Sequence, residues 1–177
     1  AAFPVRLIES GPAGGAIFAA DLARRYGRDR VLSFDMGGTT AKISLIDDFT
    51  PQTAKTFEVD RTARFKKGSG MAISIPVIDM IEIGAGGGSI AGVDALGQIR
   101  IGPRSAGSEP GPAAYDRGGD EPTVTDANVE LGRLQPDTFG AADIVLSPAR
   151  ATEAIDRAVA TPLEMDTRHA AIGIAEV

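Results

Sequence analysis

One stretch of the sequence decides the fold: Ser33-Phe34-Asp35-Met36-Gly37-Gly38-Thr39-Thr40-Ala41-Lys42-Ile43-Ser44. Apolar residues around it predict two strands, Val31–Met36 and Ala41–Ile46, and the short link between them favours an antiparallel hairpin. Asp35 stands near the end of the first strand, and a Gly-Gly turn with two threonines follows it. The stretch therefore predicts a hairpin with one carboxylate and a glycine turn at its tip.

This glycine turn has the residue types of a phosphate site. Adjacent glycines let main-chain N–H groups approach an anion without interference from a Cβ atom, and a nest of such groups suits phosphate oxygens. A carboxylate is a preferred ligand of hard divalent cations, so Asp35 can hold such an ion beside the phosphate. We predict that Gly37, Gly38, Thr39 and Thr40 bind phosphate. A plain hairpin turn is the alternative, because Gly-Gly commonly supplies the positive φ of such turns.

A second glycine loop, Gly84-Ala85-Gly86-Gly87-Gly88-Ser89, follows the apolar segment 73–83. A sharp loop after a buried strand is a place where a ligand can approach the main chain, so a ligand contact is one explanation. The alternative is that the glycines only let one backbone pack closely against another. Asp79 and Glu82, within the apolar segment, are either exposed or paired with a cation, because an unpaired buried carboxylate is costly.

The composition excludes several classes of function. The chain has 177 residues, enough for one domain with a substantial core. No apolar run approaches the roughly 20 residues of a membrane span, and the net charge of −6 argues against a nucleic-acid partner. The absence of cysteine fits a reducing compartment, and we expect the cytoplasm. His169 is the only histidine, which argues against a Ser-His-Asp triad or a multi-histidine zinc site.

The remaining sequence predicts a layered α/β domain in which strands, hairpins and helices are mixed, rather than a strictly alternating parallel sheet. Segment 102–122, rich in Gly, Pro and Ser, predicts an ordered surface excursion. Capping is the default explanation for the polar run 123–128. Further predicted elements are a helix from Ser10 to Gly27, strands at 56–60, 90–93 and 98–101, and helices from Thr125 to Leu134, from Pro148 to Pro162 and from Asp166.

Four motifs in register identify a family resemblance. They are Ser10-Gly11-Pro12-Ala13-Gly14-Gly15, Phe34-Asp35-Met36-Gly37-Gly38-Thr39-Thr40, Ile83-Gly84-Ala85-Gly86-Gly87-Gly88-Ser89-Ile90-Ala91 and Pro122-Thr123-Val124-Thr125-Asp126-Ala127-Asn128. In this order they make the chain similar to the hydantoinase A/5-oxoprolinase family, which includes acetone and acetophenone carboxylase subunits. The resemblance implies an α/β, actin-like ATPase fold of the sugar kinase, Hsp70 and actin superfamily, with a ribonuclease-H-like mixed sheet.

The resemblance also implies a function. Family members use ATP with Mg²⁺ or Mn²⁺ to phosphorylate an amide or carbonyl oxygen, and rings such as hydantoin or 5-oxoproline are then opened. Asp35 becomes the expected catalytic residue and metal ligand, with Asp79 as a second metal ligand. Expected cofactor contacts are Gly37, Gly38, Thr39, Thr40, Gly84, Gly86, Gly87 and Gly88.

The expected partners are the cyclic amide, a hydantoinase B-type subunit or domain, and an N-terminal lobe of the same polypeptide. That lobe would carry another Asp-x-Gly-Gly-Thr turn, which is not present here, so we expect residues 1–177 to be one hydantoinase A-type domain from a longer chain. Many family members carry histidine at the position of Ile81, so no role of that histidine is transferred. Alternatives are the ATP-using subunit of a ketone carboxylase and a non-catalytic module that docks a partner.

Overall fold

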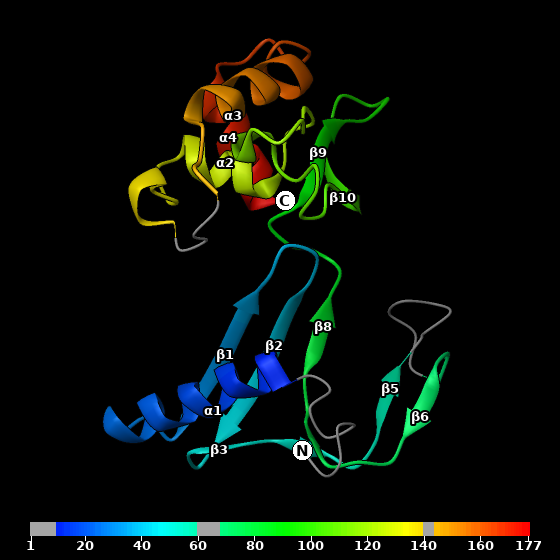
Figure 1. Cartoon of the computed structure of the whole chain (residues 1–177), viewed down its shortest axis with the longest axis vertical. Helices are drawn as coiled ribbons and strands as arrows, with labels where there is room; N and C mark the ends of the chain where they lie inside the picture. Colours follow the sequence, from blue (N-terminus) through cyan, green and yellow to red (C-terminus); the bar gives the residue numbers. More distant parts are fainter. Residues whose placement is uncertain (1–9, 60–67, 140–143) are drawn as a thin grey trace. The chain divides into compact units, whose positions relative to one another are not determined.

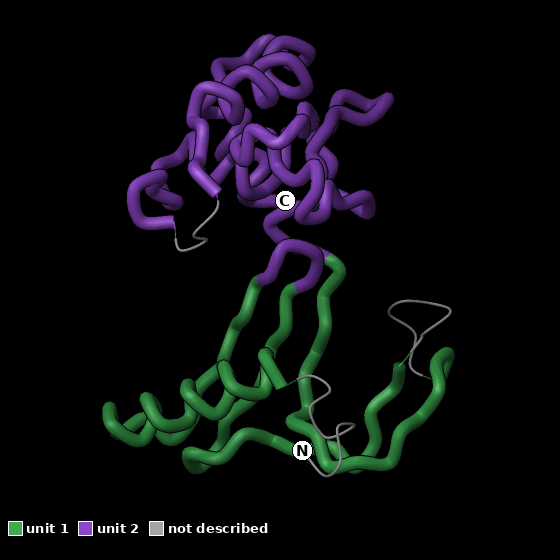
Figure 2. Tube along the Cα trace, in the orientation of Figure 1, with its two compact units in different colours: residues 1–36, 41–84 green, residues 37–40, 85–177 purple. Residues whose placement is uncertain are grey.

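A computed structural model describes residues 10–59, 68–139 and 144–177 of the chain. These residues divide into two compact units (Figure 2). Unit 1 comprises residues 1–36 and 41–84, and unit 2 comprises residues 37–40 and 85–177, so the glycine turn belongs to unit 2. The expected single domain stays a prediction.

Unit 1 is built on the predicted hairpin. Strand β2 (Ala41–Asp47) pairs along its length with β1 (Arg30–Met36), and its other edge pairs with β3 (Thr50–Pro51) and β8 (Ile81–Ile83). All three pairings are antiparallel, and short links join β2 to β1 and to β3. Two smaller pairs are β4 (Thr53–Ala54) with β7 (Val77–Ile78), and β5 (Phe57–Val59) with β6 (Met71–Ile73).

Helix α1 (Ser10–Arg25) covers one face of this sheet (Figure 1). Its buried residues Ala16, Ala20 and Ala23 recur every three or four positions, which places them on one side of the helix. On β2, Ser44 and Ile46 are buried, which identifies the face that α1 covers. The small alanines allow a close approach of helix to sheet.

Unit 2 contains one hairpin and a group of helices (Figure 1). The hairpin pairs β9 (Ser89–Val93) with β10 (Ile99–Ser105) in antiparallel fashion. The helices are η2 (Ala113–Tyr115), α2 (Val124–Glu130), η3 (Pro136–Thr138), α3 (Pro148–Ile155), its π-helical continuation η4 (Asp156–Ala160) and α4 (Thr167–Glu176).

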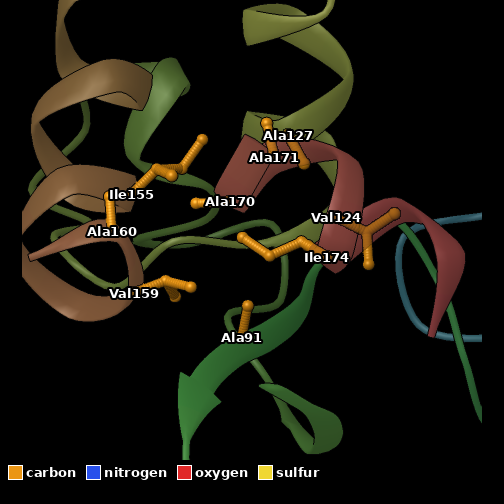
Figure 3. Packing of buried hydrophobic residues seen from close by; sticks show 9 residues of the cluster. All are labelled: Ala91, Val124, Ala127, Ile155, Val159, Ala160, Ala170, Ala171 and Ile174. Atoms are coloured by element: carbon orange, nitrogen blue, oxygen red, sulfur yellow. The ribbon is translucent and has the colours of Figure 1, made fainter. Parts of the chain in front are cut away.

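The main core of unit 2 lies where β9, α2, α3, η4 and α4 meet (Figure 3). Many of its side chains are alanines, so the helices approach one another closely around a few larger residues. Ile155, Val159 and Ile174 fill the centre and are at most 1% exposed. The cluster consists of Ala91, Val124, Ala127, Ile155, Val159, Ala160, Ala170, Ala171 and Ile174.

The structure confirms the α/β class, the first hairpin, the second hairpin and the helices that begin near Ser10, Pro148 and Asp166. The ambiguous segment 73–83 forms short strands. Every strand pair among the described residues is antiparallel, and the actin-like fold with a mixed sheet stays a prediction. No helix within the described ranges is long and apolar enough to cross a bilayer.

Two sequence-based details differ from the structure. The N-cap of α2 is Thr123, not Thr125, because Thr123 forms a capping box with Asp126, and α2 ends at Glu130. Segment 102–122 is only partly exposed, because residues 111–114, Gly119 and Pro122 are buried. The burial of residues 111–114 follows from main-chain N–H groups of Ala113 and Ala114, which donate to the buried carboxylate of Asp126.

Candidate functional site

The glycine turn forms a tight loop whose tip is exposed. The N–H of Gly37 donates to the carbonyl oxygen of Thr40 (2.9 Å), which closes the turn. Gly38 and Thr39 at the tip are exposed, and their N–H groups have no hydrogen-bond acceptor within the described part of the chain. Unpaired main-chain N–H groups at an exposed turn are suited to an anion.

The second glycine loop packs directly against this turn. The N–H of Gly87 donates to the carbonyl oxygen of Gly37 (2.9 Å), and that of Gly88 donates to the carbonyl oxygen of Gly38 (2.7 Å). The N–H of Gly86 donates to Ser89 Oγ (3.0 Å). Three N–H groups of the loop are therefore already engaged. Two of them hold the turn by donating to the carbonyl oxygens of Gly37 and Gly38.

Glycine is required at these positions because the two backbones lie in close contact. A Cβ atom on Gly86 would lie 2.7 Å from the carbonyl carbon and oxygen of Gly38, and one on Gly88 would lie 2.8 Å from the same oxygen. Real Cβ contacts are essentially never so short. Close backbone packing, one of the two explanations for this loop, is thus confirmed, while its contact with a ligand stays a prediction.

Helix α2 supports the loop from the other side. The N–H of Thr125 donates to the carbonyl oxygen of Gly87 (2.7 Å), and Thr125 Oγ1 would lie 2.6 Å from a Cβ atom on Gly87. The N–H of Ala106 donates to the carbonyl oxygen of Gly88 (2.8 Å). Turn, loop and helix thus form one continuous hydrogen-bonded arrangement within unit 2.

Asp126 anchors the start of α2. Its carboxylate is fully buried and accepts from the N–H groups of Ala113 (3.3 Å), Ala114 (2.6 Å) and Thr123 (2.7 Å) and from Thr123 Oγ1 (2.7 Å). Burial raises the pKa of Asp126 above its ordinary value, and these donors act in the opposite direction. The contacts engage both oxygens, so Asp126 acts structurally and ties η2 to α2.

Asp35 lies on β1 in a row of charged residues that crosses three strands. It is exposed and pairs in register with Lys42 of β2, which pairs in turn with Glu82 of β8. Lys42 Nζ lies 3.9 Å from Glu82 Oε1, and both side chains are partly exposed. The sequence predicts that Glu82 is either exposed or paired with a cation, and the strand register places it beside Lys42 in this row.

Asp79 lies between β7 and β8 and is exposed. Its N–H donates to the carbonyl oxygen of Gln52 (2.8 Å), which fixes the main chain there. No group of three or more Asp, Glu, His or Cys side chains suited to a metal ion occurs in residues 10–59, 68–139 and 144–177. The predicted metal roles of Asp35 and Asp79 therefore stay predictions.

Sequence reasoning missed the supporting contacts of the turn. Thr125 and Ala106 hold the glycine loop through main-chain N–H groups, and such contacts leave no side-chain pattern in the sequence. Asp126 did carry a signal, because Thr123 followed three residues later by an acid is a capping-box pattern. That signal predicts the cap but not the contact with η2.

Comparison with known proteins finds relatives that match nearly the whole of this chain. The caprolactamase subunit alpha of Pseudomonas jessenii is 39% identical over 170 residues, which are 96% of this chain and 23% of the relative. The acetophenone carboxylase gamma subunit of Aromatoleum aromaticum is 38% identical over 169 residues, 94% of this chain and 22% of the relative.

A solved structure shows the same fold. The crystal structure of the ATP-dependent caprolactamase from Pseudomonas jessenii matches with a TM-score of 0.72 and 38% identity, over 93% of this chain and 23% of that chain. The chain thus spans less than a quarter of the length of these relatives. The family model of hydantoinase/oxoprolinase matches residues 1–177. The chain therefore belongs to the hydantoinase/oxoprolinase family.

Proposed function

We propose that this chain is part of an ATP-dependent enzyme that opens cyclic amides of the hydantoin or 5-oxoproline kind. The observation that carries the proposal is the glycine turn, whose exposed N–H groups at Gly38 and Thr39 have no acceptor among the described residues. Relatives support it, since one is a caprolactamase subunit and its solved counterpart is named as ATP-dependent. A ring amide is a poor electrophile because resonance ties up its carbonyl group.

The residues of the turn fit a phosphate group. The N–H groups of Gly38 and Thr39 would donate to phosphate oxygens, and the hydroxyls of Thr39 and Thr40 add donors beside them. The loop from Gly86 to Gly88 supports the turn by donating to its carbonyl oxygens. This contact does not use the N–H groups of Gly38 and Thr39. A turn held in this way is preorganised, which is how an enzyme stabilises charge that develops during reaction.

Asp35 is the proposed metal ligand and catalytic residue. Its carboxylate is exposed on the strand that leads into the turn, and carboxylate oxygens are the usual ligands of Mg²⁺ and Mn²⁺. Asp79 is the proposed second ligand. ATP would supply the phosphoryl group that turns the amide oxygen into a leaving group. The task of this chain would be to position that group and to neutralise its charge.

In this proposal, the whole enzyme contains further parts besides this chain. We assign it an actin-like ATPase fold, completed by an N-terminal lobe with a second phosphate turn and by a hydantoinase B-type subunit or domain. The relatives support a multi-subunit assembly, because caprolactamase and acetophenone carboxylase are each named by subunit.

A second candidate is the ATP-using subunit of a ketone carboxylase. The acetophenone carboxylase gamma subunit favours it, at 38% identity over 94% of this chain. In that case the phosphorylated oxygen belongs to an enolate or to bicarbonate. Ring opening and bicarbonate-dependent carboxylation, assayed with the intact complex, separate the two candidates.

The proposal is tested by Asp35→Asn in the full-length enzyme complex. We expect ATP turnover to fall about 100-fold or more, the usual cost of removing one group that stabilises developing charge. Asp47→Asn is the matched control, because Asp47 is also an exposed aspartate of the same hairpin but lies at its opposite end. Turnover that survives Asp35→Asn contradicts the catalytic role, and a wild-type complex without ATP turnover supports the docking module.

A further inference from the structure

One face of the β1–β2–β8 sheet is apolar and largely exposed in the part of the chain that the structure describes. In antiparallel strands, residues paired in register share a face. Leu32 of β1 pairs with Leu45 of β2, and Phe34 of β1 pairs with Ile43 of β2, which pairs with Ile81 of β8. These residues continue one apolar face across three strands.

The exposure of these side chains is high for their size. Phe34 is 57% exposed, Leu32 56%, Leu45 44% and Ile81 60%. At the end of the face next to the turns, Met36 is 42% exposed and Ile83 41%. We call these six residues, together with Ile43, the apolar sheet face. Contiguous apolar surface of this kind marks an interaction site in a soluble protein.

The opposite face of the sheet carries the buried and the charged residues of these strands. Ser44 and Ile46 are buried on that side, where α1 packs. The charged row of Asp35, Lys42 and Glu82 also belongs to that side, because these residues alternate with those of the apolar sheet face. The apolar sheet face therefore has no charged residue between Leu32 and Met36, and its occupant has to be apolar.

The sheet is also open at its edge. In the described residues β1 pairs with β2 alone, so its second edge is free to accept another strand. A groove of about 410 Å³ lies beside this strand and is lined by Ala19, Leu22, Ala23, Tyr26, Arg28 and Val31. Val31 pairs with Ile46 and so lies on the α1 side, which places this groove at the open edge and on the face opposite the apolar sheet face.

We propose that the apolar sheet face docks another segment of the same, longer polypeptide. The chain matches only 22–23% of the length of its subunit relatives, so most of each relative lies outside the matched region. A segment of the same polypeptide is present at high effective concentration and can cover such a face permanently. Interfaces this apolar are typical of permanent contacts rather than transient ones. The proposal does not depend on nucleotide binding.

Photo-crosslinking in the full-length protein tests the occupant. Benzoylphenylalanine replaces Phe34, a substitution that keeps the aromatic ring, and in a second variant it replaces Ile81. The matched control carries it at Leu96, which is 80% exposed in the turn between β9 and β10. Mixing ¹⁵N-labelled with unlabelled protein distinguishes crosslinks within one polypeptide from those between copies.

We expect both face variants to crosslink, within one polypeptide, to peptides that lie outside residues 1–177. We expect these products to be lost when the probe sits at Leu96. Crosslinks to a second copy or to another subunit would overturn the proposal. So would a yield at both face positions that does not exceed the yield of the Leu96 control, since the face would then be open to solvent.

Discussion

The N–H of Gly87 donates a hydrogen bond of 2.9 Å to the carbonyl oxygen of Gly37. This bond joins the second glycine loop to the turn that follows Asp35, two motifs that are far apart in the sequence. The loop donates to carbonyl oxygens of the turn, so the N–H groups of Gly38 and Thr39 stay without an acceptor among the described residues. Substitutions in the loop should therefore act on the turn through the backbone.

Gly86→Ala should displace the turn. Its Cβ atom would lie 2.7 Å from backbone atoms of Gly38, and backbone cannot move aside as a side-chain end can. We expect a loss of about 1–3 kcal/mol in the free energy of unfolding, typical of overpacking, and a matching loss of ATP turnover. Urea unfolding and ATPase assays of the full-length enzyme measure both effects.

Gly92→Ala is the control for this prediction, because among the described residues a Cβ atom at that position meets nothing within 4 Å beyond its own chain neighbours. We expect Gly92→Ala to keep both stability and turnover. If Gly86→Ala behaves like Gly92→Ala, the close contact between the loop and the turn does not exist in solution.

Gly87→Ala should be rescued by a second substitution. The added Cβ atom would lie 2.6 Å from Thr125 Oγ1, the nearest atom to it, and 3.9 Å from the carbonyl oxygen of Gly37. Thr125→Ala removes that hydroxyl and keeps the N–H that donates to Gly87. In a double-mutant cycle followed by thermal unfolding, we expect the two changes together to cost less than their sum. Thr125→Ser retains the hydroxyl and should not rescue, and simple additivity would contradict this packing.

The local elements were predictable because their signals are local. The β1–β2 hairpin follows from apolar strands on both sides of Gly37-Gly38, and α1 follows from its start at Ser10 and the stop at Gly27, whose φ is +62°. The cap of α2 was misplaced because Thr123 and Thr125 are both good caps. Asp126, three residues after Thr123, decides between them.

The arrangement of the candidate site was less predictable, because main-chain contacts hold it. A bond such as that from Thr125 N–H to the Gly87 carbonyl is open to any residue type, so the sequence carries no mark of it. Burial of residues 111–114 was missed for a similar reason, since Gly and Pro are typical of the surface. The buried carboxylate of Asp126 overrides that tendency by binding two N–H groups in this segment.

Asp166 should titrate below its ordinary range. The side chain of His169 and its main-chain N–H, at 3.0 Å, both bind this carboxylate and lower the pKa of Asp166 from its reference value of 3.8. Because folding lowers the pKa of Asp166, its carboxylate stabilises the folded state in full at a pH above the unfolded pKa of 3.8. This stabilisation is lost as the pH falls through the lower, folded pKa. Asp166→Asn should keep the cap of α4, because Asn is a good N-cap, but lose this acid dependence.

Carbon-detected NMR of the Asp166 carboxyl group measures this pKa directly. His169→Ala removes the ring contact and leaves the main-chain N–H, so the pKa should then rise toward 3.8. A pKa at or above 3.8 in the unmodified protein would show that the pair between Asp166 and His169 does not form.

Asp126→Asn should be the most destabilising of these changes. The buried carboxylate accepts four hydrogen bonds, from Ala113, Ala114 and Thr123. In asparagine an NH₂ group replaces one of the two oxygens, and this group cannot accept a hydrogen bond. Leaving buried donors without an acceptor costs about 1–3 kcal/mol per group, so we expect a loss of at least about 2 kcal/mol in the free energy of unfolding.

Asp137→Asn, at an exposed position of η3, is the control and should change stability by less than about 0.5 kcal/mol. Since Asp126 acts on the turn through α2 and Thr125, partial loss of ATP turnover should accompany the loss of stability. Equal stability of the two variants in urea unfolding would mean that the carboxylate does not hold η2 against α2.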